Sequence, residues 1–232
     1  MCIRDRKSSS RQIQLVNSFE DLTSTSFFEE MNAFCWKREL EGDFSEIVHK
    51  ISFSENIHIL NSEQLNSLHL SEQGERARKT LLNDMQLLEA HGASPVLNLI
   101  RSYERDDFFF PTDVYSYHVD RSPIPTSTFL CTYHGAASDI LPNDQAEQKI
   151  HVPEIRERLR ELHDGTDASF DHFLSEHFFD LHYRAKSGAT PINLGTGHLW
   201  RLAVDHPNSP SLPCVHRAPI EKDGQTRLLL IC

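Results

Sequence analysis

The stretch Tyr117-His118-Val119-Asp120 places a histidine and a carboxylate two residues apart, in a segment that we expect to form a β-strand. Because successive side chains of a strand point to opposite faces, His118 and Asp120 would share one face. A third candidate ligand, His216, lies near the C-terminal end of the sequence. Two imidazoles and one carboxylate form the donor set that holds Fe(II) and leaves other coordination positions open. The stretch therefore predicts a metal centre.

The segments around this stretch indicate further strands. Val114 to Asp120 and Thr128 to Tyr133 read as two strands joined by a proline-containing loop, and the short segments 214–216 and 227–231 read as the last two. A close strand–loop–strand unit after the metal pair is what a double-stranded β-helix requires. We therefore expect an α+β protein with a distorted double-stranded β-helix core, of the jelly-roll or cupin-like type, and helices packed on one side of it.

Periodic apolar residues predict helices outside that core. The clearest helix spans Ser71 to His91, where the Ser71 side chain can cap the first turn. Two more are expected from Pro153 to Gly165 and from about Ser169 to Arg184. Both fall within a helical insertion over about residues 151–185 of the β fold.

The two ends of the chain differ in character from its middle. Residues 1–26 are rich in Ser, Thr and charge, so we expect a loose N-terminal arm there and a single domain over residues 27–232. Residues 1–6 resemble adapter-derived sequence at the ends of metagenomic reading frames and are left out of the fold prediction. The chain stops at Cys232, directly after an apolar run. This ending leads us to expect a truncated fragment.

Two residues are candidates for binding an acidic co-substrate beside the metal. Arg227 opens the last expected strand, and a guanidinium there can clamp a carboxylate through two hydrogen bonds. With the metal ligands in place, we prefer this role to that of a sheet-edge arginine that reaches water. Tyr133 suits a hydrogen bond to the same carboxylate and a place in the core equally well. We expect 2-oxoglutarate as this co-substrate.

The chain contains 14 histidines, and most of them are expected to be structural or exposed. A lone His-x-Asp pair is common by chance and is more often a surface histidine beside a turn aspartate. His198 and His206 compete with His216 as the distal ligand, and His216 is preferred because Arg227 follows at a suitable interval. Three more histidines lie five residues apart in the last expected helix: His172, His177 and His182. That spacing does not place two ligands on one helix face.

Composition excludes several classes of function. The net charge is −11, and no cluster of Lys and Arg stands out, which argues against nucleic-acid binding. The sequence has no apolar run long enough to span a membrane. The five cysteines form no Cys-x-x-Cys pair, which indicates a reducing, cytoplasmic compartment rather than a disulfide framework.

Three motifs together resemble a bacterial domain family of unknown function, number 1826. They are Tyr117-His118-Val119-Asp120, Phe129-Leu130-Cys131-Thr132-Tyr133-His134-Gly135 and His216-Arg217-Ala218-Pro219. The resemblance covers roughly residues 35 to 232, and Ala218 stands where the family carries Ser. Members are often encoded near zinc-homeostasis genes. In motif order the family is more distantly similar to Fe(II)/2-oxoglutarate-dependent oxygenases.

These observations lead to two hypotheses about function. In the first, His118, Asp120 and His216 hold Fe(II), Arg227 and Tyr133 bind 2-oxoglutarate, and the protein hydroxylates a small-molecule or peptide substrate of unknown identity. In the second, the same three ligands serve a non-catalytic metal-binding protein linked to zinc or iron homeostasis, with Zn(II) as the alternative metal. Binding of 2-oxoglutarate would separate the two.

Overall fold

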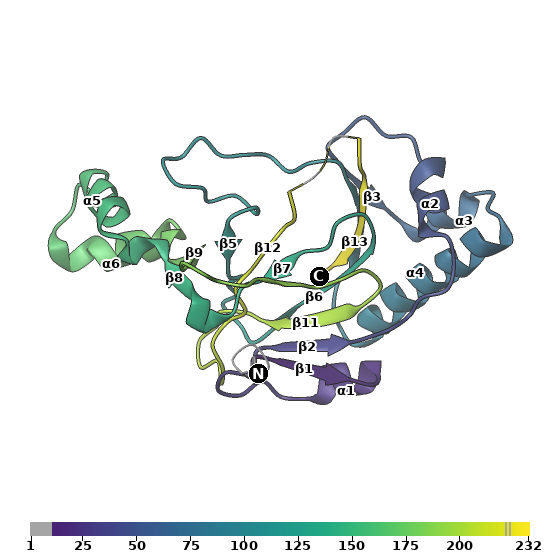
Figure 1. Cartoon of the computed structure of the whole chain (residues 1–232), viewed down its shortest axis with the longest axis horizontal. Helices are drawn as coiled ribbons and strands as arrows, with labels where there is room; N and C mark the ends of the chain where they lie inside the picture. Colours follow the sequence, from purple (N-terminus) through teal and green to yellow (C-terminus); the bar gives the residue numbers. More distant parts are fainter. Residues whose placement is uncertain (1–10, 221, 223) are drawn as a thin grey trace, which may run out of the picture.

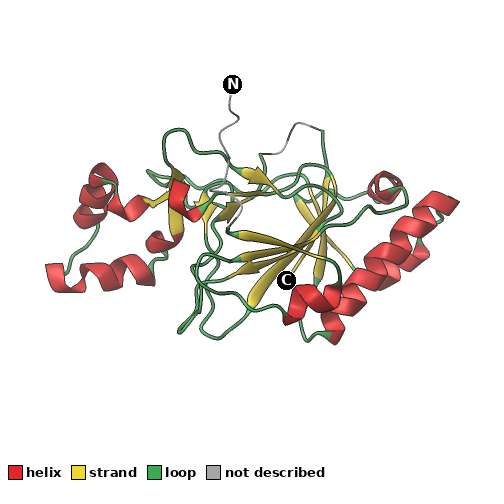
Figure 2. Ribbon diagram, turned by 60° about the horizontal axis from the view of Figure 1, so that its bottom comes forward, coloured by secondary structure: helices red, strands yellow, loops and turns green. Residues whose placement is uncertain are grey.

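The computed structural model describes residues 11–220, 222 and 224–232, and it contains two β-sheets with helices at both ends (Figures 1 and 2). The strands of the larger sheet are β1 (Ile13–Val16), β2 (Ala33–Trp36), β3 (Ile57–Leu60), β4 (Val96–Ile100), β6 (Ser127–His134), β11 (Leu199–Ala203) and β13 (Arg227–Ile231). Those of the smaller sheet are β5 (Tyr117–His118), β7 (Asp139–Ile140), β8 (Ala146–Gln148), β9 (His182–Ala185), β10 (Ile192–Asn193) and β12 (His216–Arg217). The chain is thus an α+β protein.

The order of the strands defines how the chain winds between the sheets. The larger sheet has the order β1-β2-β11-β6-β13-β4-β3, and it is mixed because β1 and β2 run parallel. The smaller sheet has the order β10-β7-β12-β5-β9-β8, all its pairs are antiparallel, and it curls into a half-barrel. From β4 to β7 and again from β10 to β13, successive strands alternate between the two sheets, whereas β7 and β10 are neighbours in the smaller sheet.

The larger sheet is covered on its outer face by one group of helices. They are α1 (Phe19–Ser24), α2 (Phe44–Lys50), α3 (Ser62–Ser67) and α4 (Glu72–Ala90). The expected helix over Ser71 to His91 is confirmed, and the Ser71 hydroxyl accepts a hydrogen bond from the Gly74 amide at 3.1 Å, as a capping residue does. Within the described part of the chain, no helix has the length and apolar character that crossing a bilayer demands.

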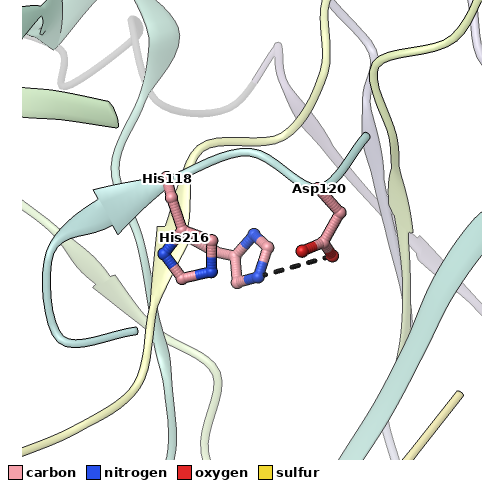
Figure 3. Close-up of side chains that lie close together, drawn as sticks. All are labelled: His118, Asp120 and His216. Atoms are coloured by element: carbon pink, nitrogen blue, oxygen red, sulfur yellow. Dashed lines mark ion pairs between the residues drawn. The ribbon is translucent and has the colours of Figure 1, made fainter. Parts of the chain in front are cut away.

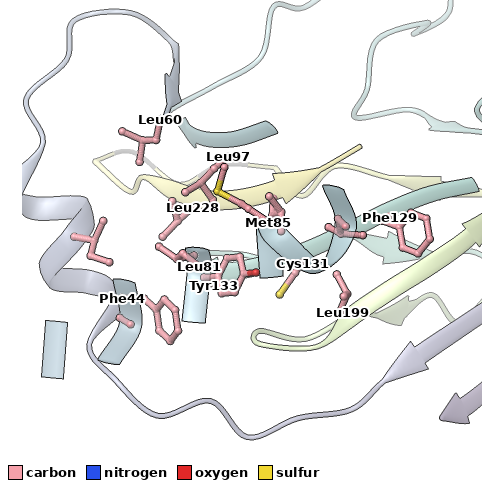
Figure 4. Close-up of a cluster of buried hydrophobic side chains, with 14 of the residues drawn as sticks. Phe44, Leu60, Leu81, Met85, Leu97, Phe129, Cys131, Tyr133, Leu199 and Leu228 are labelled. Carbon is pink, nitrogen blue, oxygen red and sulfur yellow. The ribbon is translucent and has the colours of Figure 1, made fainter. Parts of the chain in front are cut away.

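The two faces of the larger sheet contribute to two separate cores. On the outer face, Phe129, Cys131 and Tyr133 of β6 point toward α4, where Leu81 and Met85 meet them (Figure 4). Residues of the inner face pack instead between the two sheets: Cys35, Ile100, Leu130, Trp200, Leu202 and Leu229. Because side chains alternate along a strand, the strands β2, β4, β6, β11 and β13 each supply both cores.

The expected insertion lies between β7 and β10, and we call residues 146–185 the insertion lobe. It contains α5 (Pro153–Glu161) and α6 (Phe170–Glu176), and it lies at the end of the molecule opposite α4 (Figure 1). The predicted second helix is too long, because α6 ends at Glu176 and the chain returns as strand β9. Phe178, with φ of 60°, adopts the left-handed conformation that breaks the helix.

The loose arm expected over residues 1–26 is wrong for residues 11–26. These residues form β1 and α1, with Val16 and Leu22 buried against the core. The prediction failed because β1 gains its partner from β2, which lies beyond the arm in sequence. Such a tertiary contact overrides a weak local pattern. Residues 1–6, set apart in the sequence analysis, lie outside the described residues.

Candidate metal centre

The smaller sheet brings His118 and His216 together. Strands β5 and β12 are antiparallel neighbours, and His118 and His216 are direct partners in their register. Their ring centroids lie 4.6 Å apart, and Asp120 follows β5 by two residues. The three side chains each offer one ligand atom within 4.8 Å of the others, so they could hold a metal ion (Figure 3).

The orientation of both imidazoles is fixed by backbone carbonyls. His118 Nδ1 lies 2.8 Å from the Ser116 carbonyl oxygen, and His216 Nδ1 lies 3.2 Å from that of Cys214. Since a carbonyl only accepts, each Nδ1 carries the proton and donates it. In the neutral form of each ring, Nε2 then carries the lone pair that a metal can bind. His216 Nε2 lies 3.7 Å from Asp120 Oδ2, so the two potential ligand atoms face each other.

Burial favours the neutral form of His118. Desolvation, followed by the nearby His216, lowers the pKa of His118 to about 4. Burial alone would raise the pKa of Asp120, but His216 and a hydrogen bond from the Thr128 hydroxyl together lower it below its usual value. At neutral pH the site therefore presents a neutral imidazole at His118 and an ionised carboxylate, which is the state that a divalent cation requires.

The backbone next to Asp120 is held by an arginine. Arg121 Nε donates to Asp205 at 2.6 Å, and its Nη2 donates to Asp180 of the insertion lobe at 2.6 Å. The Asp205 amide also donates to the Asp120 carbonyl oxygen at 2.8 Å. Asp120 is thus tied both to the end of β11 and to the insertion lobe.

A pocket of about 320 Å³ connects these ligands with Arg227. Arg227 begins β13 of the larger sheet, its side chain is buried, and it lines the same pocket as His118, Asp120 and His216. Its Nη2 donates to the Thr132 and Ser138 hydroxyls at 2.9 and 2.8 Å. A buried guanidinium therefore shares one cavity with the ligand cluster, and the binding of a carboxylate by Arg227 stays a prediction.

Tyr133 lies on the wrong face of β6 for the role suggested for it. Its hydroxyl donates to Asp84 of α4 at 2.6 Å, in the outer core. Asp84 also pairs with Arg38 at 2.8 Å, so Tyr133 belongs to a buried network between α4 and the sheet. Side-chain alternation decides this, because Leu130 and Thr132 of β6 point inward. The expected contact of Tyr133 with a co-substrate is corrected accordingly.

The other histidines lie apart from the cluster, with one exception. His198 Nδ1 accepts a hydrogen bond from the Arg38 amide at 3.3 Å, and His206 lies in an exposed loop. His182, which the sequence analysis places in the last expected helix, is instead a buried residue of β9 and the register partner of His118. The five-residue spacing of these histidines does not indicate the pairing of His182 with His118, because β9 begins only after α6 has ended.

We compared the chain with protein families, curated proteins and solved structures. No protein-family model, no curated protein and no solved structure matches the chain. The resemblance in three motifs described above stays a prediction, and the proposal of a function rests on the geometry of the pocket.

Proposed function

We propose that the protein is an Fe(II)- and 2-oxoglutarate-dependent oxygenase that hydroxylates an organic substrate. The observation that carries the proposal is the buried Arg227 in the same pocket as His118, Asp120 and His216. A metal-binding protein without a co-substrate has no need for a buried cation beside its metal, because the two positive charges repel each other. A dicarboxylate bound between them removes this cost.

The order of the strands supports the proposal. Eight strands divide equally between the sheets: β4, β6, β11 and β13 lie in the larger, and β5, β7, β10 and β12 lie in the smaller. They alternate along the chain except at β7 and β10, which pair with each other. We propose that these eight strands form a double-stranded β-helix. His118 then lies on its second strand, His216 on its seventh, and Arg227 begins its eighth, so that all three face the space between the sheets.

Each residue of the pocket has a distinct role in this function. His118, Asp120 and His216 would hold Fe(II), and Arg227 would bind a carboxylate of 2-oxoglutarate. Bound iron supplies the activation of O2, and the overall reaction converts 2-oxoglutarate, O2 and substrate to succinate, CO2 and hydroxylated product. The apolar walls of the pocket exclude water from the reacting groups.

The second function, a non-catalytic zinc or iron handler, uses the same three ligands. The donor set of two imidazoles and one carboxylate is equally suited to Zn(II). In a metal handler Arg227 would bind no co-substrate. This function therefore predicts that the protein binds the metal and does not bind 2-oxoglutarate.

Calorimetry on the zinc-loaded protein separates the two functions. We expect 2-oxoglutarate to bind to wild type, and Arg227→Met to weaken that binding by at least tenfold, since a charge-assisted hydrogen bond contributes about 1.5–3 kcal/mol. Arg217→Met is the matched control, because Arg217 pairs with Asp139 at 3.0 Å and does not line the pocket. Zinc binding with no heat from 2-oxoglutarate would favour the metal handler.

A further inference from the structure

The inner face of the larger sheet continues from the pocket to an open edge. Ile57 of β3 is the register partner of Ile100 in β4, and Ile100 is the partner of Arg227 in β13. Partners in register share a face of the sheet. A second row runs alongside, in the order Ile59, Asn98 and Leu229. Two cross-strand rows therefore lead from the edge strand to the interior of the pocket.

The outer ends of these rows are aliphatic and exposed. Ile57 is 40% exposed and Ile59 is 62% exposed, and both lie on the last strand of the sheet. Val114, at 36% exposure, lines the pocket together with Ile57. The apolar wall of the pocket thus extends onto the surface through Ile57 and Val114, and Ile59 lies next to Ile57 on the same face of β3. A contiguous apolar surface of this kind marks a ligand-binding site more than chance exposure does.

The wall offers few polar groups to a ligand. Seven of the described lining residues are aliphatic: Ile57, Ile100, Val114, Leu130, Ala218, Leu229 and Ile231. Apart from the three metal ligands, Arg227 is the one charged residue among the described lining residues. Asn98 Nδ2 already donates to the Val96 carbonyl oxygen at 3.2 Å, and Ser138 accepts from Arg227. The part of a ligand that lies on this wall is therefore uncharged.

We propose that the substrate of this site carries an alkyl chain that lies on the two rows, with Ile57 and Ile59 under its outer part. The proposal rests on the proposed function, because the pocket of the metal ligands receives the inner end of the chain. A peptide in the same place would leave amide groups without partners inside the pocket, at a cost that an alkyl chain does not incur.

Calorimetric titration of the metal-free full chain with n-alkanols, from butanol to octanol, tests the proposal. We expect saturable binding that tightens by up to about fourfold for each added methylene group, the factor that burial of one methylene supplies. No metal or 2-oxoglutarate is needed, so the result is independent of the test of the proposed function. Metal and 2-oxoglutarate binding without this length dependence would overturn the alkyl-chain proposal alone.

Two edge strands of the larger sheet provide a matched pair of variants. Ile59→Asn on β3 should weaken octanol binding at least threefold, whereas Leu15→Asn on β1, at a residue 61% exposed, should leave it unchanged. Equal losses in both variants would overturn the proposal. Binding of an extended valine-rich hexapeptide that is tighter than alkanol binding, with no length dependence among the alkanols, would also overturn it, because the β3 edge would then bind a polypeptide. A dimer seen in light scattering that Ile59→Asn dissociates would overturn it as well, because the β3 edge would then bind a second copy of the chain.

Discussion

We expect His118 and His182 to make the metal-free protein less stable in acid. Burial lowers the pKa of His118 to about 4, and burial together with His118 lowers that of His182 to about 4. Both values lie below the 6.5 of an unfolded histidine. Between about pH 4 and about pH 6.5, the unfolded chain therefore binds more protons than the folded chain does. The free energy of unfolding consequently decreases as the pH falls from about 6.5 to about 4.

Urea denaturation at a series of pH values measures this loss. We expect the free energy of unfolding to fall over that window at constant ionic strength, and we expect His182→Phe to reduce the slope because it removes one of the two groups. His172→Phe is the control, since His172 is exposed on α6. A slope that is the same in wild type and His182→Phe would show that His182 does not titrate with folding.

Alternation along single strands explains which site residues the sequence could predict. His118, Asp120 and His216 followed from a strand pattern together with donor chemistry, and the structure brings them together. Tyr133 could not be placed, because knowing that residues alternate does not say which face is inner. His182 could not be found either, since its neighbour His118 is 64 residues away in sequence and the pairing of β5 with β9 sets the contact.

At the scale of elements, Arg121 connects the segment that carries Asp120 to the insertion lobe. Its guanidinium joins Asp205 after β11 to Asp180 before β9. The Val119 amide also donates to the Leu181 carbonyl oxygen at 3.1 Å, so two neighbouring links hold the segment that carries Asp120. We expect Arg121→Met to weaken Zn(II) binding about tenfold, the lower end for loss of a group that orients a metal ligand.

A competition titration against a chromophoric chelator measures the zinc affinity. Arg156→Met is the matched control, because Arg156 pairs with Asp171 in the insertion lobe at 3.2 Å, away from the ligands. We expect its zinc affinity to equal that of wild type. An Arg121→Met protein that binds zinc as tightly as wild type would show that Asp120 keeps its position without Arg121.

Elements with strong local signals were predicted well, and those that depend on distant partners were not. α4 and β6 carry periodic apolar residues over many positions, and both lie where expected. β5 and β12 are two residues long each, so they depend on their neighbours in the smaller sheet rather than on propensity. For the same reason β1 was missed, and the end of α6 was placed too late.

At the scale of the whole molecule, the candidate metal ligands come from segments far apart in sequence, so a bound metal would join them. A metal that binds the folded chain and not the unfolded chain adds stability, by about 2.7 kcal/mol at one hundred times its dissociation constant. For a chain of this size we expect a rise in melting temperature of roughly 5–10 °C. Differential scanning calorimetry with and without Zn(II) measures it. His118→Ala should show no rise, and a rise as large as in wild type would place the metal elsewhere.

The most direct test of the central claim is an anaerobic titration of the metal-free protein with Fe(II) and 2-oxoglutarate, followed by visible absorption. The account predicts a metal-to-ligand charge-transfer band in wild type, no band in His118→Ala, and a band in Arg227→Met only at much higher 2-oxoglutarate concentration. Absence of the band in wild type that has bound Fe(II), at saturating 2-oxoglutarate, would contradict the assignment as an oxygenase.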